Sequence, residues 1–165
     1  MSTYPDPGGS ESQFPASVET AAGSLLSVWD ASRERISSQL SASQLRALMV
    51  VDERDGINLR GLAASLGMLL SSASRLCDRL VAAGVLEREP GQHDRREIAL
   101  HLTGAGQALL DELRGYRRER LATVLDRMSV TGRRALLRGL WEFDAALRAE
   151  LADQVAGEGD AVRSA

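Results

Sequence analysis

The sequence predicts a mainly α-helical fold with one small β-hairpin, and two patterns support that prediction. Apolar residues recur at helical spacing through most of the chain, whereas the stretch after Gly84 alternates apolar with polar or small residues, as half-buried strands do. Gly84 stands between the two patterns, where a left-handed glycine would end a helix. A helix followed directly by a short hairpin is the arrangement of a winged helix-turn-helix.

The first two predicted helices are separated by a clear start signal. The first helix, residues 18–39, has one apolar stripe made of Val18, Ala22, Leu25, Trp29 and Ile36. The second begins with a capping box, in which Ser41 is the N-cap and Gln44 follows three residues later. The polar run at residues 52–56 ends this second helix.

A short third helix and a longer fourth helix follow. Asn58 is a suitable N-cap for the third, Leu59–Leu66, which Gly67 ends. The fourth runs from about Leu70 to Ala83. Its apolar residues share one face and are therefore expected to lie in the core: Ala73, Leu76, Cys77 and Leu80.

The predicted hairpin has a polar and basic tip. Its strands are residues 85–88 and 98–102, and the turn chemistry between them comes from Pro90, Gly91, His93 and Asp94. Arg95 and Arg96 place two guanidinium groups at this tip, and such groups suit phosphates and narrow grooves.

Two long helices close the chain and carry more apolar surface than their own fold needs. Thr103 caps a helix that reaches about Met128, and Ser129 begins another whose stripe is Leu136, Leu140, Phe143, Leu147 and Leu151. Surplus apolar stripes are buried against a partner, and identical chains most often pair about a two-fold axis. We therefore expect a homodimer; the alternative is a monomeric helical domain.

Length and composition indicate one ordinary globular domain. The 165 residues are 44% hydrophobic and 26% charged, with a net charge of −3. We expect a disordered N-terminal tail at 1–17, a domain at 18–152 and a loose C-terminal tail at 153–165. The domain comprises a winged helix at about 41–103 and dimerisation helices at about 18–39 and 104–152. The absence of a long apolar run or signal segment, together with a single cysteine, predicts a cytoplasmic protein with no membrane association.

Four segments, in order, resemble the MarR family of winged-helix transcriptional regulators. The hairpin run Asp94-Arg95-Arg96, followed by Leu102-Thr103-x-x-Gly106, is similar to the family's wing signature. Upstream, the similar segments are Leu40-Ser41-x-x-Gln44-Leu45, Leu62-Ala63-x-x-Leu66-Gly67 and Ser74-Arg75-Leu76-x-Asp78-Arg79-Leu80. The resemblance implies a homodimer that regulates transcription, as a repressor, on an inverted repeat of double-stranded DNA.

The fourth helix would then be the recognition helix, and its polar face and the wing would contact DNA. The expected contacts are Ser71, Ser72, Ser74, Arg75, Arg79, Asp94, Arg95 and Arg96. Asp78 is expected to pair with Arg75 or with a neighbouring loop. Leu69 and Leu70 replace the Ser or Thr that family members place before this helix, so no cap is available. The two leucines either meet thymine methyl groups or pack under the wing, and we favour packing.

The resemblance also implies a small aromatic or lipophilic acid as effector, and Trp29 and Arg46 are its candidate ligands. Cys77 is expected to be a structural thiol rather than a redox sensor, because it lies on an apolar face. No catalytic or cofactor motif is present, and the two histidines lack ligand spacing for a metal. We therefore expect neither an enzyme nor a cofactor. The alternative function is a winged-helix module for protein association without DNA binding.

Overall fold

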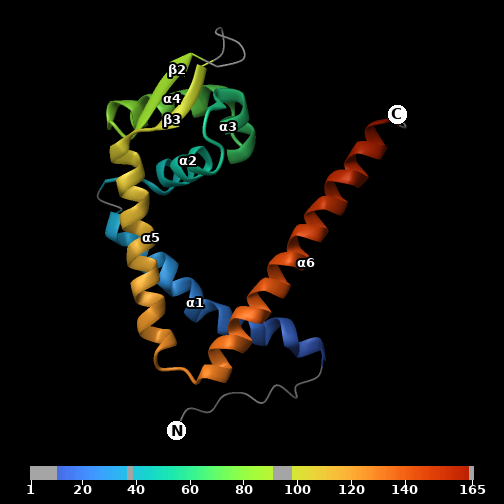
Figure 1. Cartoon of the computed structure of the whole chain (residues 1–165). Helices are drawn as coiled ribbons and strands as arrows, with labels where there is room; N and C mark the ends of the chain where they lie inside the picture. Colours follow the sequence, from blue (N-terminus) through green and yellow to red (C-terminus); the bar gives the residue numbers. More distant parts are fainter. Residues whose placement is uncertain (1–10, 37–38, 91–97, 164–165) are drawn as a thin grey trace. The chain divides into compact units, whose positions relative to one another are not determined.

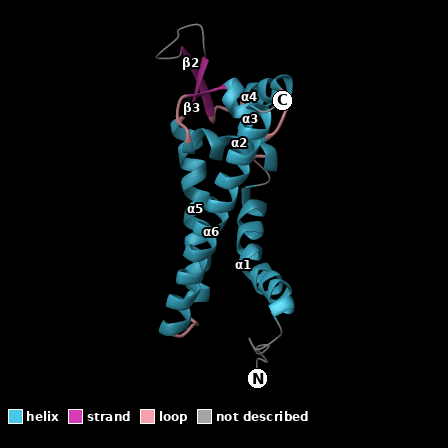
Figure 2. Cartoon of the chain, turned by 90° about the vertical axis from the view of Figure 1, so that its right-hand side faces the viewer, coloured by secondary structure: helices cyan, strands magenta, loops and turns pink. Residues whose placement is uncertain are grey.

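The computed structural model describes residues 11–36, 39–90 and 98–163 (Figure 1). Its elements are η1 (Glu11–Gln13), α1 (Phe14–Ile36), α2 (Ala42–Glu53), β1 (Ile57–Asn58), α3 (Leu59–Leu66), α4 (Leu70–Ala82), β2 (Leu86–Pro90), β3 (Ile98–Leu102), α5 (Gly104–Leu125) and α6 (Val130–Arg163). The chain divides into two compact units, residues 1–120 and 121–165. The predicted fold class, mainly helical with a small β wing, is confirmed (Figure 2).

The predicted starts of α2, α3 and α5 are confirmed by side chains that accept hydrogen bonds from first-turn N–H groups. Ser41 Oγ accepts from the N–H of Gln44 at 3.3 Å, and Gln44 Oε1 accepts in return from the N–H of Ser41 at 2.8 Å. Asn58 Oδ1 caps α3 through the N–H of Gly61 at 2.8 Å, and Thr103 Oγ1 caps α5 through the N–H of Gly106 at 3.1 Å. Each cap satisfies a donor that the helix itself cannot satisfy.

The end of α4 sets the direction of the hairpin. Gly84 has φ +72°. Its N–H donates to the carbonyl of Val81 at 2.9 Å, and the N–H of Val85 donates to the carbonyl of Leu80 at 3.1 Å. This pair of bonds is a Schellman motif, which turns the chain from α4 into β2.

The sheet has three antiparallel strands in the order β1-β3-β2, one more than the sequence predicted. In the hairpin Leu86 pairs with Leu102 and Pro90 pairs with Ile98, while Ile57 of β1 pairs with Leu100. With only two residues, β1 is too short to produce a period-2 pattern. The hairpin turn, including Gly91, His93, Asp94, Arg95 and Arg96, lies outside the described residues.

One core joins the winged helix to the start of α5. Its largest fully buried side chains come from α2, α3, α4, both hairpin strands and α5: Leu48, Leu62, Leu80, Leu86, Leu100 and Leu110. The predicted apolar face of α4 is in this core, because Ala73, Leu76, Cys77 and Leu80 are all buried. None of the described helices is both long and apolar enough to cross a lipid bilayer.

The structure extends the terminal helices beyond the predicted domain. α1 begins at Phe14, inside the segment predicted to be a disordered tail, because Pro15 fits the first turn of a helix. α6 continues to Arg163, through most of the predicted loose tail. Adding residues to an existing helix costs far less than starting one, so α6 continues through Gly157 and Gly159.

Gly106 is needed where α5 meets the end of α4. A Cβ atom at this position would overlap the carbonyl oxygen of Val85, which is backbone and cannot move aside. We expect Gly106→Ala to lower the free energy of unfolding by about 1–3 kcal/mol, as overpacking does. Gly115→Ala on the same helix is the control, since nothing lies within 4 Å of its Cβ. Urea unfolding followed by circular dichroism measures both, and equal midpoints for parent and Gly106→Ala would contradict this close contact.

Candidate nucleic-acid interface

α4 presents a polar face opposite its buried one. Ser71, Ser72, Arg75 and Arg79 are exposed, and Ser74 is half-buried. Arg79 Nε donates to the carbonyl of Arg75 at 3.3 Å. Within the described part of the chain, neither guanidinium forms an ion pair, so both keep their charge available for a ligand.

The start of α4 is uncapped, as predicted, but the two leucines do not pack under the wing. Leu69 is the N-cap residue and makes no side-chain cap hydrogen bond. Its side chain is 76% exposed, and that of Leu70 is 45% exposed. The favoured prediction of packing was therefore wrong. Met68 explains the difference, because it packs against the core one residue earlier.

Asp78 forms an ion pair with a residue that the sequence analysis did not single out. Arg88 Nη2 of β2 donates to Asp78 Oδ1 at 2.7 Å, across from helix to strand. An exposed pair of this kind adds little stability. It does neutralise the acidic side chain on the outer part of α4, and it ties the base of the hairpin to that helix. The exposed face of α4 is consequently positive, through Arg75 and Arg79.

Cys77 lies behind this surface and is buried. Burial raises the pKa of its thiol, and the nearby Arg88 opposes that effect only in part. A raised pKa leaves less thiolate, the reactive form. These features favour a structural cysteine over a redox sensor.

The wing residues Asp94, Arg95 and Arg96 fall in the segment 91–97, outside the described residues. β2 and β3 lead into that segment from Pro90 and Ile98, which pair with each other. The predicted contribution of the three residues to DNA binding therefore stays a prediction.

A second candidate site lies within the first unit, in a cavity of about 530 Å³. It contains both predicted ligand residues, Trp29 of α1 and Arg46 of α2. The remaining wall is apolar and cationic, and it comprises Arg33, Ala42, Ser43, Leu45, Met49, Leu66, Met68 and Arg117. Leu66 and Met68 belong to the segment that leads directly into α4.

Arg117 of α5 is the residue of this cavity that sequence reasoning missed. Its Nε donates to Oγ of the fully buried Ser32 at 2.9 Å, and its guanidinium lies 5.8 Å from the centre of the Trp29 ring. Burial lowers the pKa of Arg117, and the charges of Arg33 and Arg114 lower it further. In the described ranges no carboxylate pairs with Arg117, whereas Arg33 pairs with Asp30 at 2.7 Å. The cavity thus holds a half-buried positive charge beside an aromatic ring.

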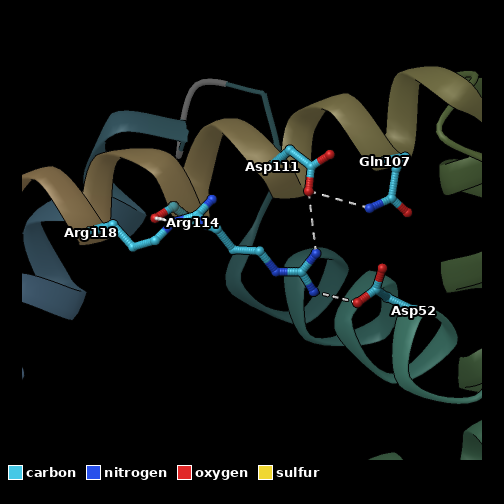
Figure 3. Close-up of polar contacts among 5 residues, drawn as sticks. All are labelled: Asp52, Gln107, Asp111, Arg114 and Arg118. Carbon is cyan, nitrogen blue, oxygen red and sulfur yellow. Dashed lines mark hydrogen bonds and ion pairs between the residues drawn. The ribbon is translucent and has the colours of Figure 1, made fainter.

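A polar network fixes α5 against α2 (Figure 3). Arg114 donates to Asp52 of α2 and, at 3.4 Å, to Asp111. Gln107 also donates to Asp111, at 3.3 Å. The hydrogen bond to Asp52 raises the pKa of Arg114, so this residue stays charged.

In the described ranges, no three His, Cys, Asp or Glu side chains are grouped so that they could hold a metal ion. His101 forms a pair with Asp55 at 2.8 Å and thereby joins β3 to the turn after α2.

Comparison with known proteins agrees with the winged helix-turn-helix fold. It also matches the middle segment of the chain to a known family. Residues 38–97 match the MarR family. The HTH-type transcriptional regulator PetP of Rhodobacter capsulatus is 33% identical over 76 residues, covering 46% of each chain. The HTH-type transcriptional regulator YfiV of Bacillus subtilis is 26% identical over 101 residues, covering 61% of this chain and 63% of that one. The matches thus span less than two thirds of these relatives.

Solved structures match over more than four fifths of this chain. RV1404 from Mycobacterium tuberculosis has a TM-score of 0.77 and 28% identity, covering 86% of this chain and 97% of the other. FabT from Streptococcus pneumoniae, solved in complex with DNA, has a TM-score of 0.67 and 17% identity, covering 82% and 98%. The second likeness concerns the fold alone.

Proposed function

Because the chain belongs to the MarR family of winged helix-turn-helix transcriptional regulators, we propose that it binds double-stranded DNA as a homodimer and represses transcription in response to a small effector. The observation that carries the DNA proposal is the exposed face of α4. It offers Ser71, Ser72 and two arginines without ion-pair partners in the described ranges, and Arg88 neutralises its carboxylate. Serine hydroxyls and the paired N–H donors of arginine guanidinium groups are suited to base edges and phosphates in the major groove.

The hairpin would hold the flanking DNA. We assign Arg95 and Arg96 to phosphate and the minor groove, with Asp94 orienting Arg96, because arginine is the residue that suits narrow grooves. Charges across residues 41–103 cancel, with eight arginines against eight acidic residues. DNA affinity should therefore be moderate and should fall as salt rises, with a slope set by the small number of arginines that contact phosphate.

Selection from a random duplex pool with the purified full-length protein tests this function. We expect an inverted repeat with half-site centres about 10 bp apart, because a two-fold dimer presents two recognition helices one DNA turn apart. If no duplex is retained even at low salt, the protein-association module becomes the better explanation of the fold.

The cavity beside Trp29 supports a ligand-responsive regulator. We propose that it takes a small aromatic acid: the carboxylate would pair with Arg117, and the ring would lie against Trp29 and the apolar wall. Such an anion would oppose the two effects that lower the pKa of Arg117, its burial first and then the repulsion from Arg33 and Arg114. Leu66 and Met68 couple the occupied cavity to α4, so that binding would change the position of the recognition helix and release DNA.

This ligand class predicts a difference between two compounds of the same shape. In a Trp141→Phe background, Trp29 fluorescence should report binding of benzoate but not of benzamide. Arg117→Gln keeps a donor but loses the charge, and should weaken benzoate binding about tenfold or more, the value of a charged hydrogen bond. Arg118→Gln, one residue along α5 and exposed, should not change it. Equal binding of both compounds would exclude an acid-specific site.

A further inference from the structure

The uncapped leucine at the start of α4 is the feature that the DNA proposal leaves unexplained. Leu69 places a large apolar side chain 76% in solvent, beside Leu70. A serine at the same position would remove that exposed apolar surface and would also cap the helix, since serine is among the preferred N-cap residues. Leucine at position 69 therefore lacks two stabilising effects that serine would provide: a helix cap and a smaller exposed apolar surface.

Local rules are most often broken at functional positions. Leu69 directly precedes Leu70, Ser71 and Ser72, which form the first turn of the helix that we propose enters the major groove. The N-terminal residues of such a helix contact base edges. An exposed leucine in that place cannot form a hydrogen bond, so it can read only an apolar group.

Among the four bases, only thymine presents an apolar group in the major groove, its 5-methyl group. We propose that Leu69 is a specificity-determining residue that reads one thymine per half-site through this methyl group. The proposal rests on DNA binding by α4. It differs from the serine and arginine contacts because it depends on no hydrogen bond and no charge.

Replacing thymine by deoxyuridine removes the methyl group and changes nothing else in the groove, so it isolates this contact. With the full-length protein and its selected duplex, each thymine of the half-site is replaced in turn. At one position the parent should bind about fourfold less tightly, the value of one buried methyl-sized group, and about fifteenfold less tightly when both half-sites are changed.

Variants at position 69 assign that loss to the leucine. Leu69→Ala should bind the thymine and deoxyuridine duplexes equally at that position. Leu69→Ser should also lose the discrimination while its melting temperature rises, because it gains a cap. Val81→Ala, an exposed apolar residue in the last turn of α4, is the matched control and should discriminate as the parent does.

The outcomes separate this inference from the function it rests on. A selected duplex in which no thymine methyl group matters would overturn it, as would a methyl preference that Leu69→Ala retains. Failure to bind any duplex would instead overturn the DNA-binding function. Loss of discrimination in both Leu69 variants, with Val81→Ala unchanged, would establish the thymine contact.

Discussion

Replacing Leu140 and Leu147 with aspartate should convert the protein from a dimer into a monomer. Both residues belong to the apolar stripe of α6, whose members are all exposed in the single chain: Leu136, Leu140, Phe143, Leu147 and Leu151. The spacing of four, three, four and four residues places them on one side of the helix. An apolar stripe of this length is typical of a helix that is covered by a partner.

Two charges in the middle of the stripe would have to be buried without partners, which a subunit interface does not tolerate. Analytical ultracentrifugation should give about twice 17.8 kDa for the parent and 17.8 kDa for the double variant. DNA affinity should fall by about 10²–10⁴-fold, because the second half-site would no longer be bound by a linked subunit.

The control places the same charges on the opposite side of α6. Ala145→Asp with Ala149→Asp should remain dimeric and bind DNA like the parent, because this side of the helix lies opposite the apolar stripe. Circular dichroism should show equal helix content in both double variants. A stripe variant that sediments as a dimer would show that α6 is not the interface.

The features that the sequence predicted correctly depend on residues close together in the chain. Ser41 and Gln44 form a capping box within one turn, and Gly84 ends α4 through bonds that span five residues. All the residues that form each of these features lie in one short segment of the chain. Such signals can be interpreted without knowing what packs on them, which is why the starts of α2 and α3 and the position of the hairpin were predicted closely.

The missed features depend on residues that only the fold brings together. Ser32 and Arg117 are 85 positions apart, and Asp78 meets Arg88 across from helix to strand. Likewise β1 exists only because β3 offers it a partner. The exposure of Leu69 could not be predicted either, because it depends on Met68 occupying the core. Composition did not predict that α1 begins at Phe14 or that α6 reaches Arg163, since a helix can extend through glycine once it has formed.

Arg75→Ala should reduce both the affinity and the sequence preference of DNA binding. Arg75 is exposed in the middle of α4 and has no ion-pair partner among the described residues. An arginine in this position can donate two hydrogen bonds to a guanine edge. Its loss should cost about 1–3 kcal/mol per half-site and relax the preference at one base pair. Titration of the selected duplex and of variants at each position measures both effects.

The wing arginine provides the comparison that separates base reading from charge. Arg96→Ala should weaken binding to every duplex and should reduce the slope of log affinity against log salt by about 0.9 per lost phosphate contact. Arg118→Ala removes the same charge from the exposed side of α5 and should leave affinity and preference close to those of the parent. If Arg75→Ala shifted only the salt slope, Arg75 would be a phosphate contact and the bases would be read elsewhere on α4. If Arg75→Ala and Arg96→Ala both bound like the parent, neither the recognition helix nor the wing would contact DNA, and the winged helix would have to serve protein association.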